Sequence, residues 1–165
     1  MTSKRKPLPS QEELQNAFFF NGSNLIHKIN HLRVKAGTVA GFVNHYGYVV
    51  IKYNSEKYYA HRLIWIYLYG KIFTDIDHIN GIRNDNRQEN LREVTRAENN
   101  QNLRKPRSVN KSGFLGVSFK KQANAYVAQI CVNKTVHHLG LYKTPEEAHE
   151  AYLTAKRKWH KTCTI

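Results

Sequence analysis

Short apolar segments separated by turn residues run through the first sixty positions, and this pattern predicts strands with one short helix before them. Ser10 and Glu13 have the spacing of a capping box, which predicts a helix through about Ala17. Residues 18–20 and 25–26 flank an Asn-Gly pair and predict a hairpin. Three further segments rich in Val, Ile and Tyr predict a small antiparallel meander, at residues 38–44, 47–53 and 57–60.

The middle of the chain predicts one buried helix followed by a strand, a loop, a strand and a short helix. His61–Gly70 is apolar almost all the way round and ends at a glycine, as expected of a buried helix with a glycine stop. Asp77–Gly81 predicts a strand that runs into an Asn-Gly turn, and residues 84–90 predict an ordered loop or a single helical turn. Leu91–Val94 predicts the second strand, and the capping-box pattern of residues 95–98 predicts the helix after it.

From Ser112 onward the pattern predicts three strands and a helix. Thr144 is a suitable N-cap, Pro145 suits the first helical position, and Glu147 closes a capping box. The strands are predicted at residues 114–120, 126–133 and 135–142. Period-two alternation assigns one face of this sheet to the helix and leaves a polar face open. The face toward the helix is predicted to comprise Val117, Phe119, Tyr126, Ala128, Ile130, Leu139 and Leu141, and the open face Ser118, Lys120, Gln129, Cys131 and His138.

The net charge of the chain indicates the class of binding partner. The 165 residues include 26 Lys and Arg against 12 Asp and Glu, which gives a formal net charge of +14. Such a balance favours a polyanionic partner with salt-dependent affinity, although ribosomal and membrane-surface proteins share it. The longest apolar run, Leu63–Tyr69, is too short to span a bilayer, so no membrane partner is expected. Two cysteines without pairing or metal-ligand spacing agree with a reducing, cytoplasmic location and predict no structural zinc.

Residues 76–102 carry the candidate chemistry. His78 can accept a proton from an attacking water, because the pKa of a neutral imidazole lies close to physiological pH. The neighbouring Asp77 side chain points to the other side of the predicted strand, which makes it an oxygen ligand for a hard cation. Asn99, in the first turn of the predicted helix, can supply a second oxygen. Mg²⁺ needs only one or two protein oxygens when water and phosphate complete its shell.

The order Asp77-His78, Asn90, Asn99 closely resembles the HNH nuclease motif in the subgroup found in phage homing endonucleases. The resemblance implies a ββα-metal fold in which His78 is the general base and Asp77 with Asn99 holds a divalent metal. Asn90 would be the middle asparagine, which ties the loop together and helps to orient His78. Many members have His at the third motif position; Asn there removes an imidazole ligand, which argues against a tight transition-metal site and favours the hard cations Mg²⁺ or Mn²⁺.

The segment before this motif adds two secondary candidates. His61 and Arg62 stand at the start of the predicted buried helix, where backbone N–H groups favour anions, so they are expected to hold a DNA phosphate. Local hydrogen bonds that satisfy both side chains are the equally simple alternative. The sequence Tyr-Ala-His-Arg-Leu-Ile-Trp also resembles the segment that precedes Asp-His in the same phage subgroup.

A basic segment without acidic residues follows the motif, and it is interpreted as a tether that follows the phosphate backbone. A merely solvated linker is the alternative. The candidate DNA-contacting side chains here are Arg104, Lys105, Arg107, Lys111, Lys120 and Lys121.

The C-terminal segment, about 112–160, resembles the apetala-type DNA-binding domain of plant regulators and phage HNH proteins. The resemblance rests on Gly116-Val117, residues 126–130, residues 138–140 and residues 144–152. It implies that the open sheet face lies in the DNA major groove. Members of that family use Arg and Trp there, whereas this chain offers Ser118, Lys120, Gln129, Cys131 and His138, which implies loose base discrimination.

These observations predict an α+β chain with a ββα-metal nuclease unit followed by a three-stranded antiparallel sheet packed on one helix. The expected divisions are an N-terminal extension with the HNH domain (1–103), a basic linker (104–111) and a DNA-binding domain (112–165). The predicted function is metal-dependent nicking or cleavage of double-stranded DNA by a homing-type endonuclease, acting as a monomer or weak dimer. The alternatives are a regulatory DNA-binding protein that retains only the HNH fold, and a basic RNA-associated protein.

Overall fold

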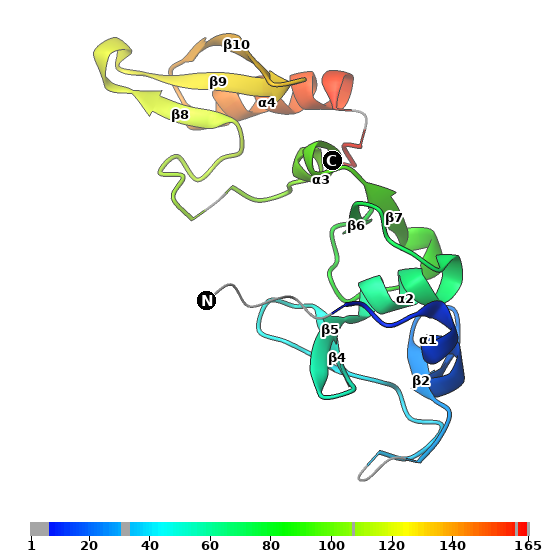
Figure 1. The fold of residues 1–165 in the computed structure, drawn as a ribbon. Helices are drawn as coiled ribbons and strands as arrows, with labels where there is room; N and C mark the ends of the chain where they lie inside the picture. Colours follow the sequence, from blue (N-terminus) through cyan, green and yellow to red (C-terminus); the bar gives the residue numbers. More distant parts are fainter. Residues whose placement is uncertain (1–6, 31–33, 107, 161, 165) are drawn as a thin grey trace, which may run out of the picture. The chain divides into compact units, whose positions relative to one another are not determined.

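The structure is a computed structural model that describes residues 7–30, 34–106, 108–160 and 162–164 (Figure 1). Its contacts divide the chain into two compact units, Met1–Thr95 and Arg96–Ile165. Both contain helices and small antiparallel sheets. The division falls before the boundary expected at residue 103, so the helix that carries Asn99 belongs to the second unit.

The first unit begins with the predicted helix and hairpin. α1 (Gln11–Ala17) starts at a complete capping box between Ser10 and Glu13, which confirms that prediction. β1 (Phe18–Phe20) pairs antiparallel with β2 (Leu25–His27). The predicted meander is also present as a three-stranded sheet, but its first strand is much shorter than expected. Its strands are β3 (Phe42–Val43), β4 (Val49–Tyr53) and β5 (Glu56–Tyr59), in that order.

α2 (Ala60–Tyr69) forms the centre of the first core, as its apolar pattern predicts. Leu63 and Ile64 are fully buried, and they pack with apolar residues from α1, β1 and β4. Gly70 ends the helix at φ 83°, a left-handed conformation that glycine adopts without the strain of a Cβ atom. This helix is therefore a rigid base for the residues that follow it.

The predicted strand, loop and strand follow α2. β6 (Asp75–His78) pairs antiparallel with β7 (Leu91–Val94), and a single 3-10 turn, η1 (Gln88–Asn90), leads into β7. Ile76 and Leu91 point into the same core as α2. The hairpin is thus fixed to the core by its apolar side chains, which leaves the polar residues of its loop to bond one another.

The second unit contains α3 (Arg96–Gln101) and the predicted sheet with its helix. The sheet order is β10-β9-β8, and α4 contacts all three strands. The Thr144 and Glu147 capping box that begins α4 is complete. The elements are β8 (Val117–Lys120), the 3-10 turn η2 (Lys121–Ala123), β9 (Ala125–Val132), β10 (Thr135–Tyr142) and α4 (Pro145–Trp159).

Two residues assigned to the helix-facing side of this sheet are instead exposed. The pairing of β10 with β9 shifts between His138 and Gly140, a β-bulge that reverses the inward and outward alternation beyond it. Leu141 is consequently 51% exposed, while Tyr142 packs into the core. Phe119 is 49% exposed at the edge of the sheet, where its ring packs beside that of Tyr126. The assignment of Leu141 was therefore wrong, whereas Phe119 lies opposite Tyr126 in the register and is only partly covered at the edge of the sheet.

Close packing between the sheet and α4 depends on a glycine. A Cβ atom added to Gly116 would lie 1.9 Å from Cδ2 of Tyr152, and Gly116 also has φ 71°. At the other end of the unit, Lys156 Nζ donates to the Leu103 carbonyl and Thr162 Oγ1 to the Glu98 carbonyl. These bonds join α3 and the residues after it to the C-terminal part of the chain. Among the described residues, no helix is both long and apolar enough to cross a bilayer.

Candidate active site

The β6–β7 hairpin of the first unit carries the predicted base and one predicted metal ligand. In its register His78 lies opposite Leu91, and Asp77 lies opposite Arg92. Asp77 is partly buried and His78 is buried, so these neighbours meet different surroundings. The loop of residues 79–90 connects the two strands and contacts His78 from one side.

Asn90 holds the loop together. Its Oδ1 accepts a hydrogen bond from the Asn80 N–H at 3.0 Å, and its Nδ2 donates to the Asp85 carbonyl at 2.7 Å. Its own carbonyl accepts from the Ile79 N–H at 2.8 Å. Asn90 is 6% exposed, so these bonds satisfy polar atoms that water reaches poorly. The contacts are those of a loop-tying residue, and a role for Asn90 in catalysis stays a prediction.

A charged pair secures the outer side of the same loop. Arg87 donates to both carboxylate oxygens of Asp85 at 2.8 Å, and Asn80 Nδ2 donates to Asp85 at 2.7 Å. Hydrogen bonding to Arg87 holds the pKa of Asp85 below its ordinary value. Asp85 therefore stays ionised across the neutral and mildly acidic range.

His78 lies among aromatic rings and one buried amide. It is 4% exposed, and its Nε2 is 3.0 Å from Oδ1 of Asn86. The His61 ring meets it edge-on at a centroid distance of 4.9 Å, and the Tyr48 ring lies 6.1 Å away. The ring orientation of His78 is thus determined by packing and by a hydrogen bond together.

Burial lowers the pKa of His78, because desolvation disfavours the charged imidazolium. The hydrogen bond to Asn86 and the negative charges of Asp77 and Asp85 oppose this effect without cancelling it. The ring is consequently uncharged at neutral pH, which is the state that can accept a proton from water.

His61 and Arg62 lie at the beginning of α2, as predicted, but in different surroundings. His61 is 7% exposed, and its ring packs against Tyr48, Tyr59 and His78. Its Nδ1 has no hydrogen-bond partner among the described residues. Burial, with smaller contributions from His78 and Arg62, lowers the pKa of His61 to about 3. A neutral His61 brings no positive charge to a phosphate, so the half-buried Arg62 is the cation available there. Phosphate binding by either residue stays a prediction.

The Asp77 carboxylate is paired with an arginine from the neighbouring strand. Arg92 donates to Oδ2 of Asp77 from Nη2 at 2.9 Å and from Nε at 3.1 Å. No cluster of three or more His, Cys, Asp or Glu side chains suited to a metal occurs in the described parts of the chain. One carboxylate can help to hold a hard cation such as Mg²⁺ when water and phosphate complete the shell, and binding of a cation by Asp77 stays a prediction.

Asn99, the other predicted metal ligand, lies on α3 in the second unit. α3 is bound to the C-terminal segment, where Thr162 also donates to Gln101 Oε1 at 3.2 Å. The pairing of Asn99 with Asp77 on one cation stays a prediction.

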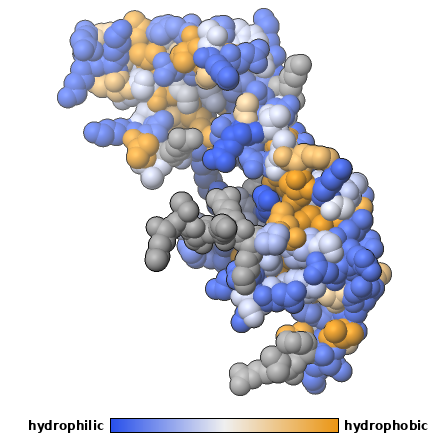
Figure 2. All heavy atoms as spheres, viewed as in Figure 1, coloured by the Kyte–Doolittle hydropathy of each residue, from blue (hydrophilic) through white to orange (hydrophobic). Residues whose placement is uncertain are grey.

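The candidate DNA-binding side chains of the linker and the sheet all belong to the second unit. The open sheet face forms a groove of about 550 Å³, and hydrophilic residues are spread over the visible face of this unit (Figure 2). Lys105 and Lys111 are exposed, whereas Arg104 donates to the Thr164 side chain. Arg107 lies outside the described residues. The groove is lined in part by Ser118, Phe119, Lys120, Lys121, Gln129 and His138.

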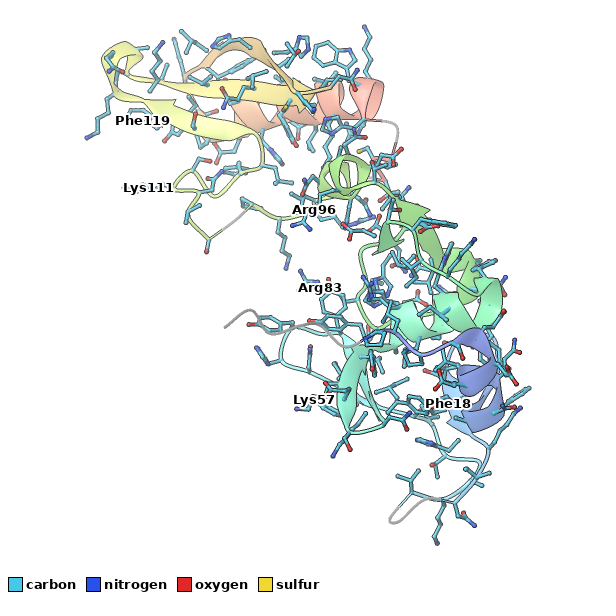
Figure 3. All side chains as sticks on the ribbon, viewed as in Figure 1. Phe18, Lys57, Arg83, Arg96, Lys111 and Phe119 are labelled. Carbon is cyan, nitrogen blue, oxygen red and sulfur yellow. The ribbon has the colours of Figure 1, made fainter. Side chains whose placement is uncertain are left out.

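Three contacting residues of the first unit were not expected from the sequence. Asn86 bonds His78, and Arg92 bonds Asp77. Arg83, labelled in Figure 3, lies over the Tyr48 ring at 5.0 Å and donates to the Tyr46 carbonyl at 2.9 Å. Arg83 therefore links the site loop to the turn between β3 and β4 and adds a positive charge beside the site. A predicted hairpin register could have found Arg92, because it lies opposite Asp77.

Comparison with known proteins agrees with this geometry. Residues 58–101 match the family model described as HNH endonuclease, a segment that runs from β5 to the end of α3 and includes Asp77, His78, Asn90 and Asn99. This segment of the chain is therefore similar to HNH endonuclease domains, and the match supports a nuclease. Searches of curated proteins and of solved structures gave no match.

Proposed function

We propose that this protein is a metal-dependent endonuclease that hydrolyses phosphodiester bonds in duplex DNA. The observation that carries the proposal is the buried, uncharged His78, oriented by Asn86 and adjacent to Asp77, within the segment that matches HNH endonucleases. One such site breaks one strand in each event, so nicking is the expected elementary reaction. A homing role is carried over from the resemblance to the phage proteins.

In the proposed reaction His78 removes a proton from a water molecule whose oxygen attacks phosphorus. The new P–O bond forms as the bond to the 3′ oxygen breaks, and that oxygen takes a proton from solvent. His78 then returns its proton to solvent, which restores the neutral ring. General-base assistance of this kind typically contributes about 10²–10⁴-fold to a rate.

Asp77 is the residue of the first unit that would hold a divalent cation, with Asn99 as the proposed second ligand. A cation bound there supplies Lewis-acid stabilisation for negative charge on the phosphate and on the departing oxygen. Arg92 fixes the Asp77 carboxylate through two hydrogen bonds, which limits its rotation. Arg62 and Arg83 are the nearby cations proposed to attract the DNA backbone.

The second unit is proposed to bind the duplex through the open face of its sheet. Exposed Lys120 and Lys121 line the groove on that face, beside Gln129 and His138. Lysines there would contact phosphates, while the amide and imidazole can bond base edges. The described residues that line this groove include no arginine, so modest sequence preference is expected.

A plasmid assay tests the catalytic proposal. We expect the full chain with Mg²⁺ or Mn²⁺ to convert supercoiled plasmid to the open circle, and excess chelator to stop the conversion. Agarose electrophoresis over time measures both. A protein that binds the plasmid but leaves it supercoiled with either metal would contradict the proposal and favour the non-catalytic DNA-binding alternative.

A charge-removal experiment tests the sheet face. Lys120→Ala with Lys121→Ala is expected to weaken duplex binding and to lower the slope of log K against log salt by about 1 for each phosphate that the protein no longer neutralises. The matched control, Arg157→Ala with Lys158→Ala, removes the same charge from exposed positions on α4. Fluorescence anisotropy at several salt concentrations measures the slopes. Equal slopes for the two double variants would count against the sheet face.

A further inference from the structure

Asn86 is the most deeply buried polar residue of the site loop, although exposed residues occur close to it in the sequence. It is 1% exposed, whereas Asn84 and Arg87 are exposed. Burial of an amide is unfavourable unless the amide is bonded. The Oδ1 atom of Asn86 lies 3.0 Å from His78 Nε2, within hydrogen-bond distance.

The bond determines which tautomer of His78 is present. An amide oxygen only accepts hydrogen bonds, so a neutral His78 must carry its proton on Nε2 to make this contact. The lone pair that can take a proton is then on Nδ1. A ring with the opposite tautomer would place two acceptors 3.0 Å apart inside the protein, which is unfavourable.

We infer that Asn86 is the positioning residue of the proposed reaction, and that it makes Nδ1 of His78 the nitrogen that receives the proton. The catalytic role given to Nδ1 rests on the proposed function. The tautomer of His78 does not, because it can be measured in the protein without substrate. Asn86 acts through His78 and touches no substrate. Asn90 has a different task, because its side chain bonds the backbone of the loop.

Packing by the surrounding rings does not by itself fix the orientation of the His78 ring, so the hydrogen bond to Asn86 is needed as well. His61 and Tyr48 pack against His78 and restrict where its ring lies, but a packed ring can turn by half a revolution about Cβ–Cγ, which puts Cδ2 in the place of Nδ1 and Cε1 in the place of Nε2. The directional bond to Asn86 distinguishes the two orientations. Loss of the bond would leave a ring that spends part of its time turned, with Cδ2 in the place of Nδ1, or in the other tautomer, with Nδ1 protonated.

The test joins spectroscopy with kinetics. In the metal-free full-length protein, ¹⁵N NMR of the histidine rings at neutral pH should show His78 protonated at Nε2, the signal being assigned by its loss in His78→Gln. Asn86→Ala should lower kcat for plasmid nicking by about 10–100-fold, the usual effect of removing a group that orients a site residue. Its KM should stay close to that of the wild type. Asn86→Asp keeps the accepting oxygen and should retain most of kcat.

The control is Asn84→Ala, which removes an exposed amide from the same loop and should leave kcat unchanged. Protonation of His78 at Nδ1, or equal kcat values for Asn86→Ala and Asn84→Ala, would overturn the inference. If Asn86→Ala does not fold, a large fall of kcat in the folded Asn86→Asp protein would also overturn the inference. If the wild-type protein nicks no plasmid, the proposed function is refuted. The NMR measurement of the His78 tautomer still tests whether Asn86 positions the ring.

Discussion

Replacement of His78 by alanine is expected to lower the rate of plasmid nicking by about 10²–10⁴-fold. The structure gives the reason, because burial keeps the imidazole uncharged and Asn86 with two aromatic rings holds it in one orientation. The alanine variant loses the proton acceptor while the Asp77–Arg92 pair remains. Single-turnover nicking at saturating protein, with Mg²⁺, measures the loss in the chemical step.

His45→Ala is the matched control for this variant. His45 is exposed on the turn between β3 and β4, so its removal also takes away an imidazole from the first unit. It should nick plasmid at the wild-type rate. The affinity of each protein for duplex DNA should be similar, which would separate chemistry from binding. Nicking by His78→Ala at the rate of His45→Ala would refute the role of His78 as the base.

Acid is expected to destabilise the first unit strongly through His61. The pKa of His61 is about 3 in the folded chain, whereas a histidine in an unfolded chain has a pKa of about 6.5. Between these values the unfolded chain binds the proton and the folded chain does not, so stability is present above pH 6.5 and is lost as the pH falls. The loss from this group is about 1.4 kcal/mol of unfolding free energy per pH unit, on the order of 5 kcal/mol in all.

Urea unfolding at a series of pH values between 7 and 4 measures this dependence. Trp65 lies in α2, so its fluorescence in a Trp159→Phe background reports on the first unit. The comparison is His61→Phe, which keeps an aromatic ring and removes the titrating group. Its unfolding free energy should fall less steeply with acid than that of the parent. If the unfolding free energies of the two proteins fall in parallel with pH, protonation of His61 does not cause the predicted loss of stability.

The order of elements could be predicted from the sequence because its signals are local. Capping boxes at Ser10 and Thr144 fix the beginnings of α1 and α4, and Gly70 fixes the end of α2. The strand β7 was predicted with its observed bounds. Such signals involve residues within one turn of each other, so they need no knowledge of the remaining fold.

The sheet face on which a side chain lies and the hydrogen-bond partner of a side chain depend on residues distant in the sequence, so both were harder to predict. One inserted residue in the pairing of β10 reverses the alternation, which is why Leu141 was assigned to the wrong side. Seven asparagines between positions 80 and 102 also look equivalent in the sequence. Only the folded loop distinguishes the buried Asn86, which bonds His78, from the exposed Asn84.

The loop of residues 79–90 also has a consequence for how acidity should affect the enzyme. Its internal bonds join amide side chains to backbone groups, and neither kind of group gains or loses a proton between pH 4 and 9. The Arg87–Asp85 pair of the loop keeps its ionisation over the same range, because the pKa of Asp85 is lowered. The bonds that hold this loop are thus insensitive to acidity, whereas the base and the His61 ring beside it can each take up a proton. A measured pH profile of nicking would therefore report the ionisation of the reacting groups and, in acid, the loss of stability through His61, without a contribution from the bonds within the loop.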